Sequence, residues 1–198
     1  MGKRSDFEPE DRHYYPTPYS AVVPLLSFLP MRSRYVEPCA GNMALVRHLQ
    51  GEGHSCSFMC DWEPQDGLIK KMNALDLSAF HLNGADYIIT NPPWGRDLLH
   101  PMIRCFSRLL PTWLLFDSDL AYTVQAAPFL ERCELIVAVG RVKWIDGTDS
   151  VGKDNCSWYK FVDRAVQTRF VGKKEKQKCY KTKDLFKKPS KENGWINA

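Results

Sequence analysis

The chain has 198 residues, of which 44% are hydrophobic, 12% aromatic and 25% charged. This balance supplies the core of one domain and excludes a wholly disordered, collagen-like or coiled-coil chain. Lysine and arginine number 27 against 23 aspartates and glutamates, a net charge of +4. No apolar stretch approaches the roughly 20 residues of a membrane span, so we expect no membrane partner.

The positive charge is concentrated at the C-terminus. Residues 163–198 contain 11 lysines and arginines against 4 acidic residues, a net of +7 that leaves −3 for the rest of the chain. The sequence therefore predicts a flexible N-terminus over residues 1–14, a folded domain over 15–165 and a basic, flexible tail over 166–198. The tail either keeps the chain soluble or contacts nucleic-acid phosphates, with Lys173 and Lys174 as candidate contacts.

The cysteines do not form a recognisable framework. All 7 are scattered without a Cys-x-x-Cys pair, and no histidines accompany them at zinc spacing. We expect reduced thiols in a cytoplasmic protein and no metal site. The first residues are charged and polar, which predicts that there is no signal peptide.

Apolar runs and helical patterns alternate along the chain. Helical spacing is found over residues 19–29, 42–50, 98–110 and 120–130. Strand-like runs cover residues 34–36, 55–60, 86–90, 112–116, 134–139, 141–145 and 158–162. This order predicts an α/β fold with an open, mostly parallel seven-stranded sheet, helices on both faces and a terminal antiparallel hairpin.

Polar residues stand where four of the predicted strands end. They are Glu37, Asp61, Asn91 and Asp117. Turn residues are common at strand ends, so each position alone is weak evidence. Ligands of open α/β sheets lie beyond the carboxyl ends of the strands, and the ordered set therefore predicts a ligand site at this edge.

The segment after the first strand has the properties of a ligand loop. Gly41 lets the backbone approach a ligand, but neither a dinucleotide Gly-x-Gly-x-x-Gly fingerprint nor a Walker A sequence is present. NAD and ATP are therefore disfavoured as ligands, whereas a smaller adenosine-type ligand remains compatible with this loop. Asp61 could accept ribose hydroxyl hydrogens, and Asp76 could accept from an adenine amino group.

The most specific segment is Asn91-Pro92-Pro93-Trp94, directly after a strand. The Asn91 amide oxygen and a proline carbonyl can accept the two N–H bonds of an amino group, and the Trp94 indole can stack on a ring. Such a segment suits a planar substrate with an exocyclic amine.

These segments resemble motifs I to IV of the S-adenosylmethionine-dependent amino-methyltransferases. The match consists of residues 36–42, Asp61, Asp76 and the Asn-Pro-Pro-Trp segment. Tyr15-Pro16-Thr17-Pro18 resembles the motif that precedes motif I in the adenine-N6 DNA methyltransferases. The resemblance covers residues 13–165 and implies a Rossmann-like methyltransferase sheet. The sequence departs from the pattern at Glu37, where aspartate is usual, and at Asn42, where a second glycine is often found.

The resemblance implies roles for individual residues. Asn91 and the Pro92 carbonyl would hold N6 of an adenine next to Pro93, with the base stacked on Trp94. S-adenosylmethionine would be the cofactor, bound by residues from four segments: Tyr15, Thr17, Glu37, Cys39, Gly41, Asp61, Trp62, Asp76 and Leu77.

Basic and aromatic residues interleave after the sixth predicted strand. Arg141, Lys143 and Lys153 alternate with Trp144 and Trp158. This pattern suits a nucleic-acid surface, and it equally suits a hairpin with one buried face.

Three functions compete for this sequence. The first is adenine-N6 methylation of nucleic acid, with DNA favoured over RNA. The second is protein glutamine-N5 methylation, whose enzymes share Asn-Pro-Pro-Tyr; Trp94 and the basic tail count against it. The third is an inactive methyltransferase fold that binds nucleic acid, against which the intact Asn91 motif counts.

Overall fold

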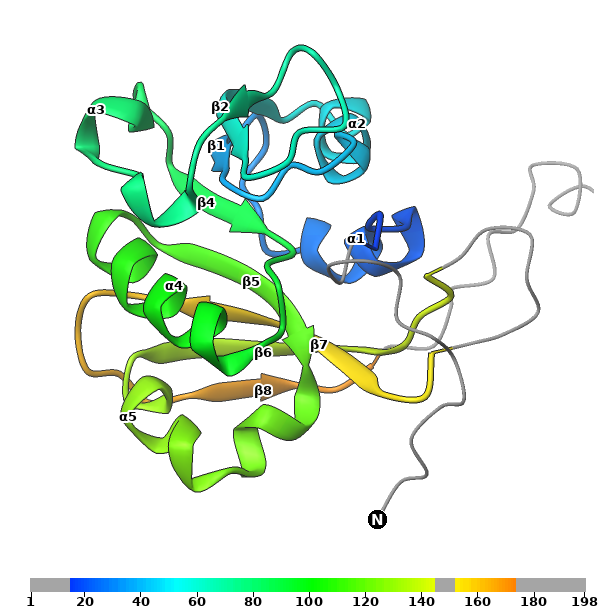
Figure 1. Ribbon diagram of the computed structural model, residues 1–198. Helices are drawn as coiled ribbons and strands as arrows, with labels where there is room; N and C mark the ends of the chain where they lie inside the picture. The colour runs from blue at the N-terminus through cyan, green and yellow to red at the C-terminus, as the bar shows by residue number, and fades with distance from the viewer. Residues whose placement is uncertain (1–14, 145–151, 174–198) are drawn as a thin grey trace, which may run out of the picture.

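The computed structural model describes residues 15–144 and 152–173 (Figure 1). They form one eight-stranded sheet in the order β3-β2-β1-β4-β5-β7-β6-β8. The strands are β1 Arg34–Glu37, β2 Ser55–Asp61, β3 Lys70–Lys71, β4 Tyr87–Thr90, β5 Thr112–Asp117, β6 Cys133–Arg141, β7 Asn155–Phe161 and β8 Arg169–Val171.

Seven of these strands run in one direction. The pairs from β3 across to β5 are parallel, β7 is antiparallel to both β5 and β6, and β8 is parallel to β6. The ends of β1, β2, β4, β5 and β6 therefore meet at one edge of the sheet, where β7 begins. The predicted mostly parallel α/β sheet with a terminal antiparallel hairpin is confirmed, with eight strands in place of seven.

Helices cover both faces of the sheet. α1 (Tyr19–Leu26) and α2 (Ala44–Gly51) pack on one face against a cluster that includes Tyr35, Trp113 and Trp158. α4 (Arg96–Leu109) and the short α5 (Ala127–Leu130) pack on the other face against Ile88, Leu114 and Phe116. Successive residues of β5 alternate between the two clusters, so this central strand is buried on both sides.

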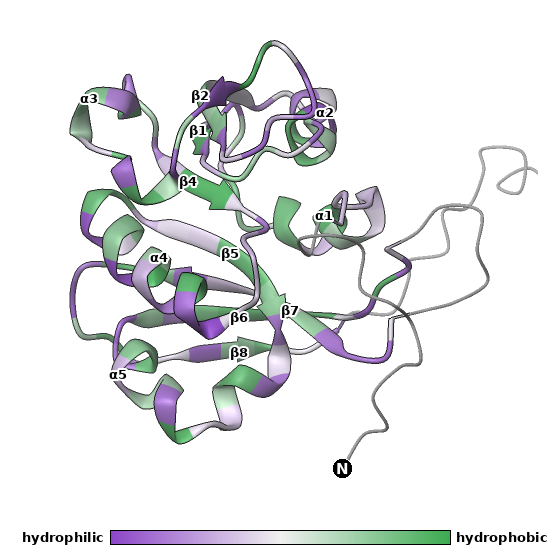
Figure 2. Cartoon of the chain, in the orientation of Figure 1, coloured by the Kyte–Doolittle hydropathy of each residue, from purple (hydrophilic) through white to green (hydrophobic). Residues whose placement is uncertain are grey.

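The sequence pattern of α4 explains its position. Leu99, Met102, Ile103 and Phe106 recur at helical spacing and are all buried. The arginines of the helix stay exposed, and Figure 2 shows hydrophilic and hydrophobic segments alternating along it. The helix ends at Leu109, shortly before Pro111, which cannot continue it.

Two predicted elements differ from the structure. The predicted helix over 120–130 is divided into η3 (Ser118–Tyr122), η4 (Val124–Ala126) and α5. Thr123 between the first two turns is extended (φ −96°, ψ 146°), and Pro128 cannot donate to a preceding carbonyl. The predicted strand over 141–145 is also wrong, because β6 runs to Arg141 and residues 142–144 form no strand.

Two strands were not predicted. β3 consists of two lysines that pair with β2, and β8 pairs with β6 from within the segment assigned to the tail. Both are too short to show alternation, and they form by pairing with an existing edge. Two further short turns, η2 (Ala74–Asp76) and α3 (Ala79–Leu82), connect β3 to β4. Among the described residues, no helix has the length and apolar character needed to cross a membrane.

Candidate functional site

The side chain of Asn91 is held in one orientation just beyond the end of β4. Its Nδ2 donates to Thr17 Oγ1 at 3.2 Å and to the Tyr15 carbonyl at 3.4 Å. Its Oδ1 accepts from Trp94 Nε1 at 3.2 Å. Because the indole nitrogen can only donate and the carbonyl can only accept, these partners fix which end of the amide is the oxygen.

Trp94 is the link between this segment and the rest of the sheet edge. Its Nε1 also donates to the Leu115 carbonyl of β5 at 3.2 Å, and its ring packs against both hydrophobic clusters. The ring centroid lies 5.6 Å from that of Trp144 in an edge-to-face arrangement, and Trp144 in turn lies 6.2 Å from Tyr15. The half-buried indole thus presents π surface, while its N–H is already used.

Glu37 is a buried carboxyl group at the end of β1. Its side chain is 1% exposed, and Oε1 accepts from Thr90 Oγ1 at 3.0 Å, which joins the ends of β1 and β4. Oε2 has no hydrogen-bond partner among the described residues. Burial raises the pKa of Glu37 well above its usual range; the Thr90 hydrogen bond opposes that shift, and the charge of Asp61 adds to it.

Asp61 closes the loop between β1 and α2. Its Oδ2 accepts from the Gly41 backbone N–H and its Oδ1 from that of Glu63, both at 2.8 Å. Gly41 has φ +53°, a conformation that glycine adopts without strain. Burial raises the pKa of Asp61, and the Gly41 hydrogen bond opposes the shift. The carboxylate oxygens keep further lone pairs for a ligand.

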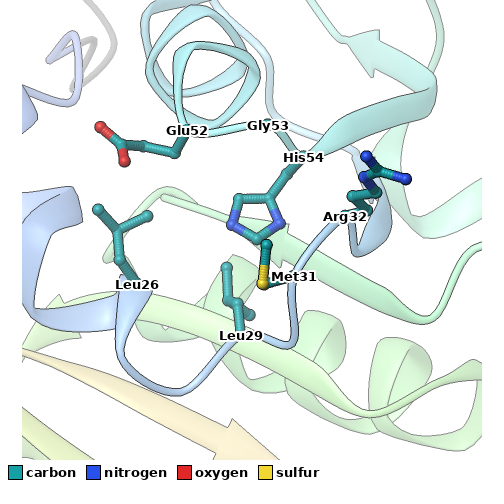
Figure 3. Close-up of a pocket in the computed structure, with 7 residues that line it drawn as sticks. All are labelled: Leu26, Leu29, Met31, Arg32, Glu52, Gly53 and His54. Atoms are coloured by element: carbon teal, nitrogen blue, oxygen red, sulfur yellow. The ribbon is translucent and has the colours of Figure 1, made fainter.

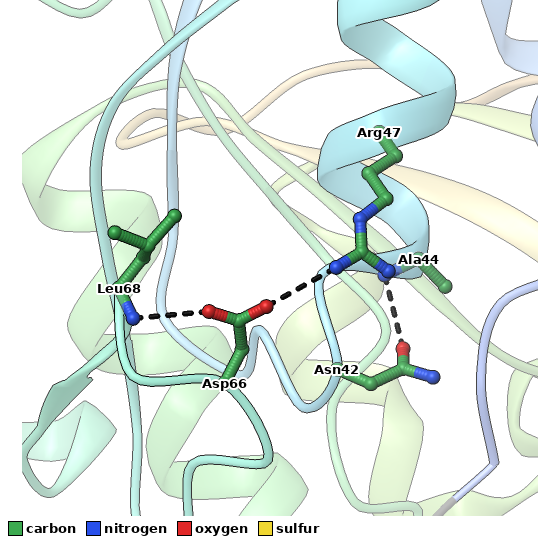
Figure 4. Close-up of polar contacts among 5 residues, drawn as sticks. All are labelled: Asn42, Ala44, Arg47, Asp66 and Leu68. Carbon is green, nitrogen blue, oxygen red and sulfur yellow. Dashed lines mark hydrogen bonds and ion pairs between the residues drawn. The ribbon is translucent and has the colours of Figure 1, made fainter.

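The loop after β2 is attached to the start of α2 (Figure 4). Arg47 pairs with Asp66 at 3.1 Å, and Asp66 also accepts from the Leu68 backbone N–H at 3.0 Å. On the other side of the contact, Asn42 Oδ1 accepts from the Ala44 backbone N–H at 3.0 Å. The loops that follow β1 and β2 are therefore held together as one unit.

The remaining predicted cofactor residues are less connected. Trp62 is 65% exposed, Asp76 is exposed at the end of η2, and Leu77 is buried in the core. Cys39 packs partly buried against the same core, and burial raises the pKa of its thiol well above the usual range. Burial thus disfavours the thiolate form, which is the reactive form of a cysteine.

The sequence motifs thus converge only in part. The structure brings Tyr15 and Thr17 onto Asn91, and Gly41 onto Asp61. Within the described ranges the Asp76 side chain makes no contact of this kind, while Pro92 is buried and Pro93 half-buried within the turn. Sequence reasoning missed Thr90, whose only signal is its place as the last residue of a strand.

The predicted nucleic-acid contacts lie at the same edge of the sheet. Arg141 ends β6, and Lys143 and Lys153 are exposed in the connection to β7. Lys173 follows β8 and lies over Gly140, so that a Cβ at Gly140 would stand 2.8 Å from its Nζ. Lys174 lies outside the described residues. Trp158 is fully buried and Trp144 half-buried, so one face of this hairpin is buried while the basic residues are exposed.

A separate cavity of about 300 Å³ lies at the opposite edge of the sheet, where β2 begins (Figure 3). It is lined by Leu26, Leu29, Met31, Arg32, Glu52, Gly53 and His54. None of the site residues predicted from the sequence lines this cavity. Among the described residues, no group of three or more metal-ligating side chains is placed to hold a metal ion.

Comparisons with known proteins find similarity in structure only. No protein-family profile matches the sequence, and no curated protein matches it. A provisionally described RNA methyltransferase from Pyrococcus horikoshii aligns with a TM-score of 0.56 at 13% identity, over 78% of this chain and 89% of the other.

Two further solved structures have the same architecture. The modification subunit of a provisionally described type I restriction enzyme from Vibrio vulnificus has a TM-score of 0.52 at 15% identity, over 86% of this chain. This chain spans only 50% of that subunit. A provisionally described class I S-adenosylmethionine-dependent methyltransferase from Listeria monocytogenes has a TM-score of 0.50 at 12% identity, over 82% of this chain and 67% of the other. The fold is therefore the Rossmann-like methyltransferase fold.

Proposed function

We propose that the chain transfers a methyl group from S-adenosylmethionine to the N6 amino group of adenine in nucleic acid, with DNA favoured over RNA. One observation carries the proposal. Asn91-Pro92-Pro93-Trp94 follows β4 of a methyltransferase-type sheet, and the Asn91 amide oxygen is oriented by a donor-only partner. That oxygen keeps a lone pair for the N–H of a target amine.

The residues at the ends of β1 and β2 fit the cofactor. Glu37 has a buried oxygen that no described residue contacts by a hydrogen bond, and burial of such an atom is costly until a donor group meets it. The ammonium group of the cofactor's methionine part would provide that donor. Gly41 and Asp61 would hold the ribose side, with Trp62, Asp76 and Leu77 beside the adenine and Tyr15, Thr17 and Cys39 lining the methionine end.

The chemistry requires no strong base. When bound, S-adenosylmethionine supplies an electrophilic methyl group. Asn91 and the Pro92 carbonyl would accept the two N–H bonds of the target amine, which turns the nitrogen lone pair out of ring conjugation. The contribution of the protein is positioning and fixed dipoles, both of which can lower the barrier substantially.

A nucleic-acid substrate is supported by the charges near Asn91. Arg141, Lys143, Lys153 and Lys173 lie along the edge of the sheet that carries Asn91. N6 of adenine is occupied in base pairs, so the target would be a flipped or single-stranded base. The preference for DNA rests on Tyr15 and Thr17, whose segment resembles the one in the DNA enzymes and contacts Asn91.

RNA is the second candidate substrate, because the Pyrococcus horikoshii structure is described as an RNA methyltransferase. The same adenine-N6 chemistry would apply, since the amine and the ring are unchanged. The basic residues would neutralise the phosphates of either strand.

The test is methyl transfer with labelled S-adenosylmethionine. Unmethylated DNA, RNA and a protein extract would each be incubated with the wild-type protein and with Asn91→Ala, and the modified monomer would be identified after digestion. We expect N6-methyladenine, mainly in DNA, and its loss in an Asn91→Ala variant that still folds and binds the cofactor. Label in protein alone, or no label from folded wild-type protein that binds the cofactor, would overturn the proposal.

A further inference from the structure

The exposed side of α4 bears a line of arginines that the proposed site does not use. Arg96, Arg104 and Arg108 occur with His100 at intervals of four residues, which brings successive side chains next to one another on a helix. Arg96, Arg104 and Arg108 are exposed, and in the described part of the chain none of the three forms an ion pair.

His100 shows that these charges share one side of the helix. Its ring lies 4.7 Å from that of Phe129, and its pKa is lowered first by burial and then by Arg104 and Arg96. Burial and the two neighbouring guanidinium groups thus disfavour the protonated imidazole, and the arginines supply the positive charge on this side of the helix.

The far half of the line opens into a hollow between α4 and α5. Arg104, Arg108 and Arg132 line a cavity of about 190 Å³ together with the buried Ser107 and the apolar Ile103, Pro128 and Phe129. The Arg104 guanidinium lies 5.4 Å from the centre of the Phe129 ring, which holds its position. Arg132 pairs with Asp163 at 2.6 Å, but both side chains are about half exposed, so this pair can be exchanged for an anion at little cost.

The line begins at the proposed target site. Gly95 caps α4, so Arg96 stands two residues after Trp94. From Arg96 to Arg108 the helix rises about 18 Å, at 1.5 Å per residue. Along the axis of a DNA duplex, where one strand has a phosphate every 3.4 Å, that distance corresponds to about five phosphates. Guanidinium groups bind phosphate oxygens in pairs, and three of them around one hollow favour an anion.

We propose that Arg96, Arg104, Arg108 and Arg132 form a phosphate-binding track for the nucleic-acid strand whose target base is held at Asn91. This inference rests on the proposed function. The track lies over one face of the sheet, and it would extend the nucleic-acid contacts beyond the basic residues at the edge of the sheet. Contacts to phosphates do not distinguish one base from another. The arginines of α4 would therefore contribute affinity for nucleic acid that does not depend on its sequence.

The experiment compares two double variants of equal charge. Arg104→Gln/Arg108→Gln removes two charges from the track, and Lys70→Gln/Lys71→Gln removes two from β3 at the far end of the sheet. Binding of labelled single-stranded and duplex DNA and of RNA would be followed by fluorescence anisotropy from 50 to 300 mM salt. We expect about tenfold weaker binding or more at 0.1 M salt for the track variant, and a salt slope smaller by about 1.4 to 1.8.

Three controls separate the outcomes. Arg104→Lys/Arg108→Lys keeps both charges and should restore most of the salt slope, while thermal stability and cofactor affinity are measured for every variant. The proposed track would be contradicted if the track variant and the β3 variant bound nucleic acid with equal affinity, or if the wild-type protein bound no strand. Methyl transfer is measured separately from binding. A protein that transfers no methyl group but binds the strand through the track would contradict the proposed function and still support the track.

Discussion

The indole N–H of Trp94 lies 3.2 Å from the amide oxygen of Asn91 and an equal distance from the Leu115 carbonyl. A single donor therefore ties the residue proposed to hold the target amine to the neighbouring strand β5. Trp94 has two proposed roles in the site: its ring would stack on the target base, and its N–H orients the Asn91 amide. The two roles can be separated by substitution.

Trp94→Phe keeps an aromatic ring and removes the N–H. A neutral hydrogen bond contributes about 1 kcal/mol, so we expect kcat to fall about fivefold with cofactor affinity unchanged. Trp94→Ala removes the ring as well and should cost much more, because stacking on a base is worth about 1–3 kcal/mol. Steady-state methylation of an adenine-containing oligonucleotide measures both. Equal activity of Trp94→Phe and wild type would show that the N–H has no part in orienting Asn91.

Thr17→Val tests the other end of the same amide. Valine keeps the shape of the buried Thr17 and removes the hydroxyl that accepts from Asn91 Nδ2 at 3.2 Å. The longer bond to the Tyr15 carbonyl remains, so we expect a reduction in kcat of about two- to tenfold, corresponding to 0.5–1.5 kcal/mol. Cofactor binding by calorimetry should change less than kcat. A variant that loses cofactor affinity and keeps kcat would assign Thr17 to the cofactor alone.

The sequence predicts local features of this site and not its long-range contacts. The Asn91 motif and Gly41 could be recognised because each motif is contiguous and follows an apolar run. The hydrogen bond between Glu37 and Thr90 joins residues 53 positions apart, and the ring contact between Trp94 and Trp144 joins segments that only the sheet brings together. Periodicity within one segment contains no information about such pairs.

The same limit applies to the fold. Buried strands such as β5 have a continuous apolar run, which made them predictable. β3 is two lysines and β8 three residues, so neither has a pattern to detect. Residues 120–130 have apolar spacing suited to a helix, but Pro128 and the extended Thr123 divide this stretch into separate turns.

Glu37→Gln should stabilise the fold at neutral pH and weaken the binding of the cofactor. Because the pKa of Glu37 is raised in the folded state, that state retains a proton that the unfolded chain has lost. The free energy of unfolding therefore falls as the pH rises from the ordinary carboxyl range to the raised pKa. Asp61, whose pKa is also raised by burial, acts in the same direction.

Glutamine removes the Glu37 part of this pH dependence while it keeps an oxygen for the Thr90 hydroxyl. Urea unfolding between pH 4.5 and 8 should show a flatter profile for Glu37→Gln than for the wild type. Calorimetry should show weaker S-adenosylmethionine binding, since glutamine cannot ionise to pair with the ammonium group of the cofactor. An equally steep or steeper pH profile in the variant would contradict the raised pKa of Glu37.

Two buried tryptophans allow a matched test of the interior. Trp158 Nε1 donates to the Ala21 carbonyl of α1 at 2.7 Å, whereas Trp113 Nε1 has no partner among the described residues; both side chains are at most 1% exposed. Replacement by phenylalanine removes the same volume from each, so the difference reports the hydrogen bond. Trp158→Phe removes the indole hydrogen bond to this carbonyl, and we expect it to be less stable than Trp113→Phe by about 0.5–1.5 kcal/mol in urea unfolding. Because α1 follows the segment that holds Asn91, methylation should also fall further in Trp158→Phe, and equal stability of the two variants would show that this bond does not anchor α1.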